Sequence, residues 1–132
     1  MARTEITALC AELAIGFKLV SLGLQGPTEN WDQAHNAYKV TISRGRKRAT
    51  IDFRTGTGWK VDPDLADVLS CMVSDASAGE ASFDDFCSDF GYDSDSRKAH
   101  ATWKACRKMS ERLSRLLDSA EIERLREACQ DF

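Results

Sequence analysis

Residues 38–54 read YKVTISRGRKRATIDFR, and this stretch decides the fold that the sequence predicts. Apolar side chains alternate with polar ones on both sides of a basic connection. The apolar positions are Tyr38, Val40 and Ile42 before the connection, and Ala49, Ile51 and Phe53 after it. Such alternation around a polar, glycine-containing connection is typical of a hairpin with one buried face. We therefore predict a β-hairpin over residues 36–54, with its apolar face packed on helices and a strongly basic tip.

Outward from the hairpin, apolar spacing predicts an N-terminal helix over residues 4–17. The apolar run at residues 18–24 is typical of an edge strand, which would be the third strand of the sheet. Residues 62–132 repeat apolar side chains at intervals of three and four, so this part of the chain is predicted to be helical. The prediction is a single α+β domain over residues 1–132, with a small antiparallel sheet packed against four to five helices.

Local signals divide the helical part. Asp62-Pro63 is a suitable helix start, and residues 75–81 are rich in small side chains and are predicted to form a loop. Ser82 and Gly91 are suitable ends for a short helix over the sequence FDDFCSDF, in which Phe83, Phe86, Cys87 and Phe90 are expected to face inward. A long helix is predicted to begin near Ser94 or Asp95, and Asp118-Ser119 marks a break before the last helix.

Composition is typical of a globular domain, with 42% hydrophobic and 30% charged residues in 132. No apolar run approaches the ~20 residues that span a bilayer, and the first residues do not resemble an export signal. We therefore expect a cytoplasmic protein with no membrane contact. The five cysteines lack metal-knuckle spacing and fall at apolar helix positions, so they are expected to be core thiols, with no cofactor.

Charge is divided into blocks, although the net charge is only −3. Residues 35–60 contain seven basic residues and one acidic residue, whereas residues 61–95 contain ten acidic residues and no basic residue. Blocks of like charge usually face an oppositely charged neighbour or a partner. The candidate acidic binding surface consists of Asp75, Glu80, Asp84, Asp85, Asp89, Asp93 and Asp95. The candidate basic binding surface consists of Arg44, Arg46, Lys47, Arg48 and Arg54.

No catalytic motif is recognisable in the chain. Asp93 and Asp95 resemble the start of an EF-hand calcium loop, but the sixth and twelfth positions of that loop would be Lys98 and Lys104. An EF-hand requires glycine and glutamate there, so the motif fails and no metal site is expected. The structural interpretation of these aspartates is helix capping, together with salt bridges to Arg97 or Lys98.

Short motifs follow one another between residues 31 and 117: YKVTI at 38–42, DFRTG at 52–56, Pro63 with DVL at 67–69, SDA at 74–76, FDDF at 83–86 and GYDSDSRKA at 91–99. Their order resembles that of a family of small, largely uncharacterised proteins of bacteriophages and prophages. The resemblance implies a phage origin and action in the cytoplasm of a bacterial host. It supplies no catalytic residues.

Small phage proteins without enzymatic motifs often act by binding a host machine. By this analogy we expect a non-enzymatic inhibitor of a CRISPR–Cas effector, an anti-CRISPR protein, which contacts the host complex through a charged surface. The alternative is a phage accessory protein that binds nucleic acid through the basic hairpin and the long basic helix. A small enzyme is the third interpretation.

Overall fold

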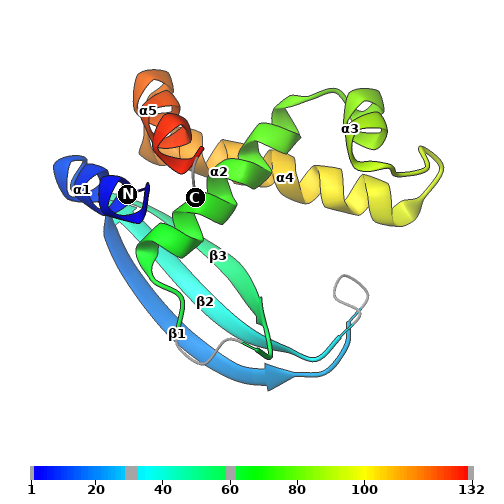
Figure 1. The fold of residues 1–132 in the computed structure, drawn as a ribbon, viewed down its shortest axis with the longest axis horizontal. Helices are drawn as coiled ribbons and strands as arrows, with labels where there is room; N and C mark the ends of the chain where they lie inside the picture. Colours follow the sequence, from blue (N-terminus) through cyan, green and yellow to red (C-terminus); the bar gives the residue numbers. More distant parts are fainter. Residues whose placement is uncertain (1, 29–32, 59–61, 131–132) are drawn as a thin grey trace.

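The computed structural model describes residues 2–28, 33–58 and 62–130. It confirms the α+β fold, with a three-stranded antiparallel sheet and five helices in these described residues (Figure 1). The elements follow in the order α1 (Ala2–Glu12), β1 (Gly16–Gln25), β2 (His35–Arg44), β3 (Lys47–Gly56), α2 (Leu65–Glu80), α3 (Phe83–Phe90), α4 (Arg97–Leu116) and α5 (Ser119–Cys129).

The sheet has the order β1-β2-β3, so the predicted hairpin and the predicted edge strand are both confirmed. Arg44 pairs with Lys47 in the ladder, and the turn therefore consists of Gly45 and Arg46 alone. Gly45 has a φ of 62°, the left-handed conformation that two-residue hairpin turns require. The ladder between β1 and β2 shifts register between Ser21 and Gly23, which leaves Leu22 as the extra residue of a bulge.

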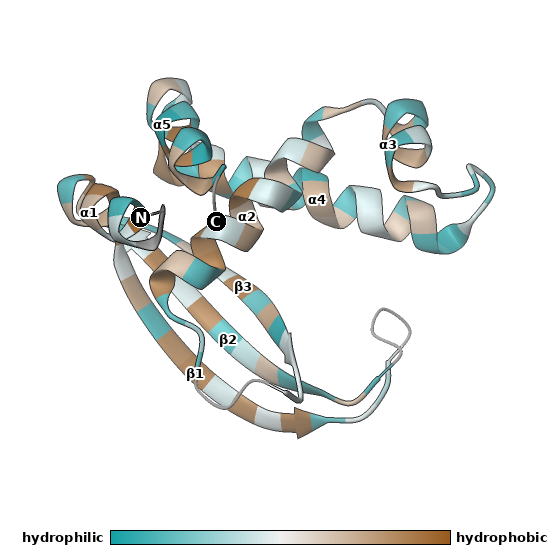
Figure 2. Cartoon of the chain, in the orientation of Figure 1, coloured by the Kyte–Doolittle hydropathy of each residue, from teal (hydrophilic) through white to brown (hydrophobic). Residues whose placement is uncertain are grey.

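One face of the sheet carries the main hydrophobic core. The strand residues in this core or packed against it share one side of the pleat: Phe17, Leu19, Tyr38, Val40, Ile42, Ala49, Ile51 and Phe53. They meet buried residues of α1, α2, α4 and α5, which gather on one side of the sheet (Figure 1). The alternation of hydrophobic and hydrophilic residues along the strands is visible in Figure 2. The alternation of apolar and polar residues in the sequence thus determined which face of the sheet is buried.

The first helix is shorter than the predicted range of residues 4–17. It ends at Glu12, and Phe17 belongs to β1 instead. Ala14 takes a left-handed conformation with a φ of 56°, and the Ile15 N–H donates to the Cys10 carbonyl oxygen over 3.0 Å. Glycine usually occupies such a left-handed position at the end of a helix, so Ala14 did not mark the end of α1 in the sequence.

Two predictions about α2 were wrong. The helix begins at Leu65 rather than at Asp62-Pro63, because Asp64 and Asp67 cap it with reciprocal side-chain to backbone hydrogen bonds. Residues 75–80, the greater part of the predicted loop, continue this helix. The small side chains there permit close packing against α4: a Cβ added to Gly79 would lie 2.5 Å from the Cys106 carbonyl oxygen.

The remaining boundaries follow the capping signals closely. Ser82 caps α3 by accepting a hydrogen bond from the Asp85 N–H, and Gly91 ends that helix with a φ of 71°. The long helix α4 begins at Arg97 behind the cap Ser96, slightly later than predicted. Asp118 and Glu121 form a reciprocal capping box at the predicted break before α5.

Candidate functional site

An acidic lobe, defined here as residues 82–95, consists of α3 and the turn that follows it. In Figure 1 it lies against the N-terminal half of α4, at the end of the molecule away from α1 and α5. Its helix is strongly amphipathic, with Phe86 and Cys87 buried and the aspartates outside. Asp84 and Asp85 lie in the first turn, where negative charge interacts favourably with the helix dipole.

Five aspartates of this lobe are exposed: Asp84, Asp85, Asp89, Asp93 and Asp95. The ion pairs among described residues join Arg44, Arg124 and Arg126 to glutamates, and none of the five aspartates takes part in them. The lobe therefore presents five exposed carboxylates that take part in none of these ion pairs, although Arg97 and Lys98 of α4 follow Asp95 closely in the chain. A surface of this kind attracts basic partners over roughly a Debye length, about 8 Å at physiological ionic strength.

The negative field of the lobe also acts on its own thiol. The pKa of Cys87 is raised, first because burial disfavours the thiolate and then because Asp84 and Asp93 lie nearby. A raised pKa keeps the thiol protonated and unreactive at neutral pH. Cys87 is thus a packing residue of the lobe, as the sequence predicted for the cysteines in general.

A small core holds the lobe on α4. Its buried members are Phe86, Cys87, Ala99 and Cys106. Phe86 stacks on Tyr92 with 5.5 Å between ring centroids, and the Trp103 indole N–H donates to the Ala81 carbonyl oxygen over 3.1 Å. Phe90, predicted to pack inward, is 58% exposed, because the small core is too shallow to cover the last turn of α3.

Two residues of the predicted acidic surface do not belong with these aspartates. Glu80 forms an ion pair with Arg126 of α5 over 3.1 Å, so its charge is partly neutralised. Asp75 lies in α2 and lines a cleft of about 280 Å³ with residues of β3 and with Met109 of α4. Burial raises the pKa of Asp75. Asp75 remains exposed, and it also lines a second cleft with Phe86, Phe90 and Tyr92 of the lobe. The tertiary structure thus places five of the seven predicted acids in the lobe and the other two on the neighbouring α2.

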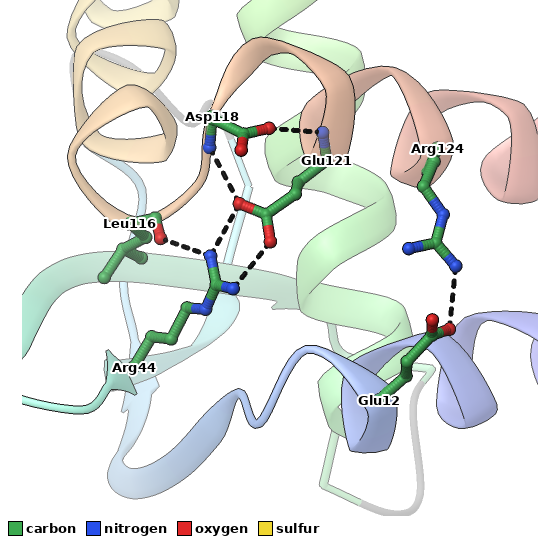
Figure 3. Close-up of polar contacts among 6 residues, drawn as sticks. All are labelled: Glu12, Arg44, Leu116, Asp118, Glu121 and Arg124. Atoms are coloured by element: carbon green, nitrogen blue, oxygen red, sulfur yellow. Dashed lines mark hydrogen bonds and ion pairs between the residues drawn. The ribbon is translucent and has the colours of Figure 1, made fainter.

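The predicted basic surface also changes, because Arg44 points to the helices rather than to solvent. Its Nη1 and Nη2 donate to Oε1 and Oε2 of Glu121, both over 2.6 Å, and Nη1 also donates to the Leu116 carbonyl oxygen over 3.2 Å (Figure 3). The Arg44 hydrogen bonds and the Asp118 N–H lower the pKa of Glu121 to about 2. Arg44 therefore fastens the hairpin to the junction of α4 and α5.

The sequence contained a signal for this outcome. Arg44 continues the alternation of Tyr38, Val40 and Ile42, so the pleat directs it to the buried face. The other four residues of the predicted basic surface, Arg46, Lys47, Arg48 and Arg54, are exposed. The same alternation places Lys18 and Lys39, which lie outside the predicted basic surface, on the uncovered face of the sheet.

The long helix contributes a second set of cations. Arg97, Lys104, Arg107, Lys108 and Arg115 are exposed along α4. Arg107 also lies over the Trp103 ring, with its guanidinium carbon 4.9 Å from the centroid, and so part of its surface is covered.

Cysteine and metal chemistry have little support in the described ranges. Cys10, Cys87 and Cys106 are buried, as predicted, but Cys71 is exposed on α2 and corrects that prediction for one residue. Within residues 2–28, 33–58 and 62–130, no group of three or more His, Cys, Asp or Glu side chains is arranged to hold a metal ion. In the same ranges, no helix combines the length and apolar character needed to cross a bilayer.

Comparison with known proteins gives no further identification. No protein-family model matches the chain, and neither a curated protein nor a solved structure matches it significantly. The fold and the surface therefore define only the class of protein. It is an α+β protein with an acidic lobe at one end and exposed cations on its sheet and its long helix.

Proposed function

We propose that this protein is a non-enzymatic binding protein whose acidic lobe docks on a basic surface of a host complex. The observation that carries the proposal is the group of five exposed aspartates without an ion-pair partner among the described residues. Basic surfaces that hold nucleic acid are the natural target of such a lobe, because the aspartates would compete for the Lys and Arg side chains that bind phosphates.

By analogy with small phage proteins, we further propose a particular host complex, the CRISPR–Cas effector of a bacterial cell. In this proposal the lobe occupies the channel that guide RNA or target DNA would otherwise occupy. The protein would act as an anti-CRISPR inhibitor in the bacterial cytoplasm.

Phage plating on a CRISPR-bearing strain and on its isogenic deletion strain tests the proposal. We expect the wild-type protein to raise plating on the CRISPR-bearing strain towards the level of the deletion strain. The variant Asp84→Asn/Asp85→Asn/Asp89→Asn should lose this effect, because amides cannot pair with the cations of the effector.

A matched control removes the same charge elsewhere. Glu5→Gln/Glu111→Gln/Glu127→Gln alters three exposed acids outside the lobe and should protect phage like the wild type. Since Asp84 and Asp85 also support the start of α3, the variant Asp89→Asn/Asp95→Asn provides a second test that leaves the first turn intact. Plating on the CRISPR-bearing strain that stays as low with the protein as without it would contradict the proposal.

A second candidate function is nucleic-acid binding by a phage accessory protein. The specific observation in its favour is that α1, α2, α4 and α5 pack on one face of the sheet, so that basic strand residues remain exposed on the other. Arg44 is removed from the interface first expected for this function, because it pairs with Glu121.

A further inference from the structure

The uncovered face of the sheet is a charged surface that the acidic lobe does not account for. Strand residues on this side of the pleat alternate with the core residues and are exposed or half-buried from Lys39 to the hairpin turn. Towards the start of β2, His35 and Ala37 share this side but are buried. The open part of the face therefore lies between Lys39 and the turn on β2 and along the adjacent parts of β1 and β3.

The composition of this face is basic and hydroxylic. Its charged members are four cations and one carboxylate: Lys18, Lys39, Arg48, Arg54 and Asp52. Between them lie the hydroxyl side chains of Thr41, Ser43 and Thr50 and the exposed Val20. Further along β1, Leu22 and Leu24 are also exposed. The exposed Arg46 and Lys47 extend the positive charge at the turn.

The strand register fixes how the cations are spaced. Lys18 is paired with Thr41, and Lys39, the next outward residue of β2, is paired with Asp52. Arg54 follows Asp52 by two residues on β3, and Arg48 precedes it by four. With strands about 4.8 Å apart and a rise of about 3.3 Å per residue, Lys18, Lys39 and Arg54 form a diagonal with steps of roughly 8 Å between Cα atoms. Arg48 lies about 20 Å along β3 from Arg54.

We propose that this uncovered sheet face binds the phosphate backbone of nucleic acid without reading its sequence. The proposal rests on the second candidate function and specifies its surface, which is the sheet face rather than the basic side of α4. Lys, Arg, Ser and Thr are the side chains with which proteins contact phosphate oxygens. The face carries these chemistries and, among its described residues, no aromatic side chain on which a base would stack.

Other partners fit this face less well. The centre of a protein interface is depleted of charge and rich in aromatic or apolar side chains, whereas here the centre is Lys39 beside Asp52. An interfacial membrane contact buries a broad apolar face, whereas the exposed large apolar side chains of the described strands, Val20, Leu22 and Leu24, are confined to the edge strand β1. A polyanion whose charges repeat along its length matches cations distributed over an extended sheet.

Fluorescence anisotropy with a short mixed-sequence DNA duplex, repeated over a series of salt concentrations, tests the proposal. The variant Lys39→Gln/Arg54→Gln removes two cations of the sheet face. Each phosphate contact contributes about 0.9 to the slope of log K against log salt for duplex DNA, so we expect the slope to fall by about 1.8. At physiological salt, we expect the affinity to fall at least about tenfold.

The matched control is Lys104→Gln/Lys108→Gln, which removes the same charge from the exposed side of α4. It should keep the wild-type slope and an affinity within about twofold of the wild type. Lys18→Gln/Arg48→Gln gives a second sheet variant, and unchanged thermal unfolding midpoints show that each variant is folded.

Each remaining outcome is decisive. Loss of binding in the α4 variant with retention in the sheet variants would keep the second candidate function and overturn the sheet-face proposal. No binding of the wild-type protein to duplex or single-stranded DNA or RNA would overturn both. Equally tight binding to anionic lipid vesicles, with the same dependence on Lys39 and Arg54, would assign the face to a membrane surface and overturn the proposal as well.

Discussion

The molecule has two hydrophobic cores of unequal depth, and they differ in what their surfaces can do. The main core joins the sheet to α1, α2, α4 and α5, whereas the small core under the acidic lobe has only Phe86, Cys87, Ala99 and Cys106 as buried members. Around the main core, Arg44 and Glu121 are bound to each other. Around the small core, five aspartates face solvent without an ion-pair partner among the described residues.

We infer that charged side chains near the main core mainly join helices and strands through ion pairs. Charged side chains on the acidic lobe are available to a partner. The two cores meet where α2 crosses α4, with Gly79 against the backbone of Cys106. We therefore expect variants in the main core, at this crossing and in the lobe to lower the stability of the protein by successively smaller amounts.

The largest effect is expected in the main core. Leu113 is 1% exposed, so Leu113→Ala removes buried methyl groups and leaves a cavity among the sheet and helices. We expect the free energy of unfolding to fall by about 3 kcal/mol. Urea denaturation measures this loss, and Leu22→Ala, at a position that is 52% exposed, should change it by no more than about 0.5 kcal/mol. Equal losses in both variants would show that the main core is misplaced.

The next effect is expected at the crossing of the two helices. In Gly79→Ala the new Cβ would overlap the backbone of Cys106, so α2 and α4 must move apart. Overpacking of this kind should lower the free energy of unfolding by about 2 kcal/mol, although alanine has the higher helix propensity. Ser77→Ala, at an exposed position of the same helix, is the control and should not destabilise the protein. A stabilised Gly79→Ala variant would contradict the close crossing.

A local effect is expected in the lobe. Phe86→Ala empties the centre of the small core, and we expect α3 to open without unfolding of the sheet. Hydrogen exchange should accelerate at least about tenfold for the amides of α3, equivalent to about 1.4 kcal/mol, while the amides of β2 keep their protection. Simultaneous loss of protection in α3 and β2 would mean that the two cores unfold as one unit.

The smallest effect concerns the ion pair of Arg44 and depends on pH. The folded-state pKa of Glu121 is lowered from 4.5 to about 2, so its contribution to stability is complete above about pH 4.5 and is lost as the pH falls towards 2. The stability difference between wild type and Glu121→Gln should therefore shrink over this interval. Thermal unfolding at a series of pH values measures it.

Glu127→Gln serves as the control for this series, because it removes the same charge from α5 and the described contacts do not join Glu127 to Arg44. We expect its stability difference from the wild type to show no comparable convergence between pH 4.5 and 2. A difference for Glu121→Gln that stays constant down to pH 2 would show that Arg44 does not hold the Glu121 carboxylate.

The predictions that succeeded depend on neighbouring residues. Alternation around Gly45 gave the hairpin and its buried face, and Ser82, Gly91 and Asp118 gave the ends of α3 and the start of α5. Each of these signals acts through the pleat or through hydrogen bonds within one turn. The prediction failed at Ala14, because alanine there adopts a conformation that its side chain does not favour.

The sequence by itself thus determined the α+β fold, the order of its elements and the separation of charge into blocks. Only the tertiary structure decided which charges remain exposed without an ion-pair partner. Arg44 meets Glu121 across 77 positions of the chain and Glu80 meets Arg126 across 46, whereas Asp75 lines clefts shared with both β3 and the acidic lobe. The physical reason is that alternation and capping act over a few residues, whereas an ion pair depends on how distant elements pack.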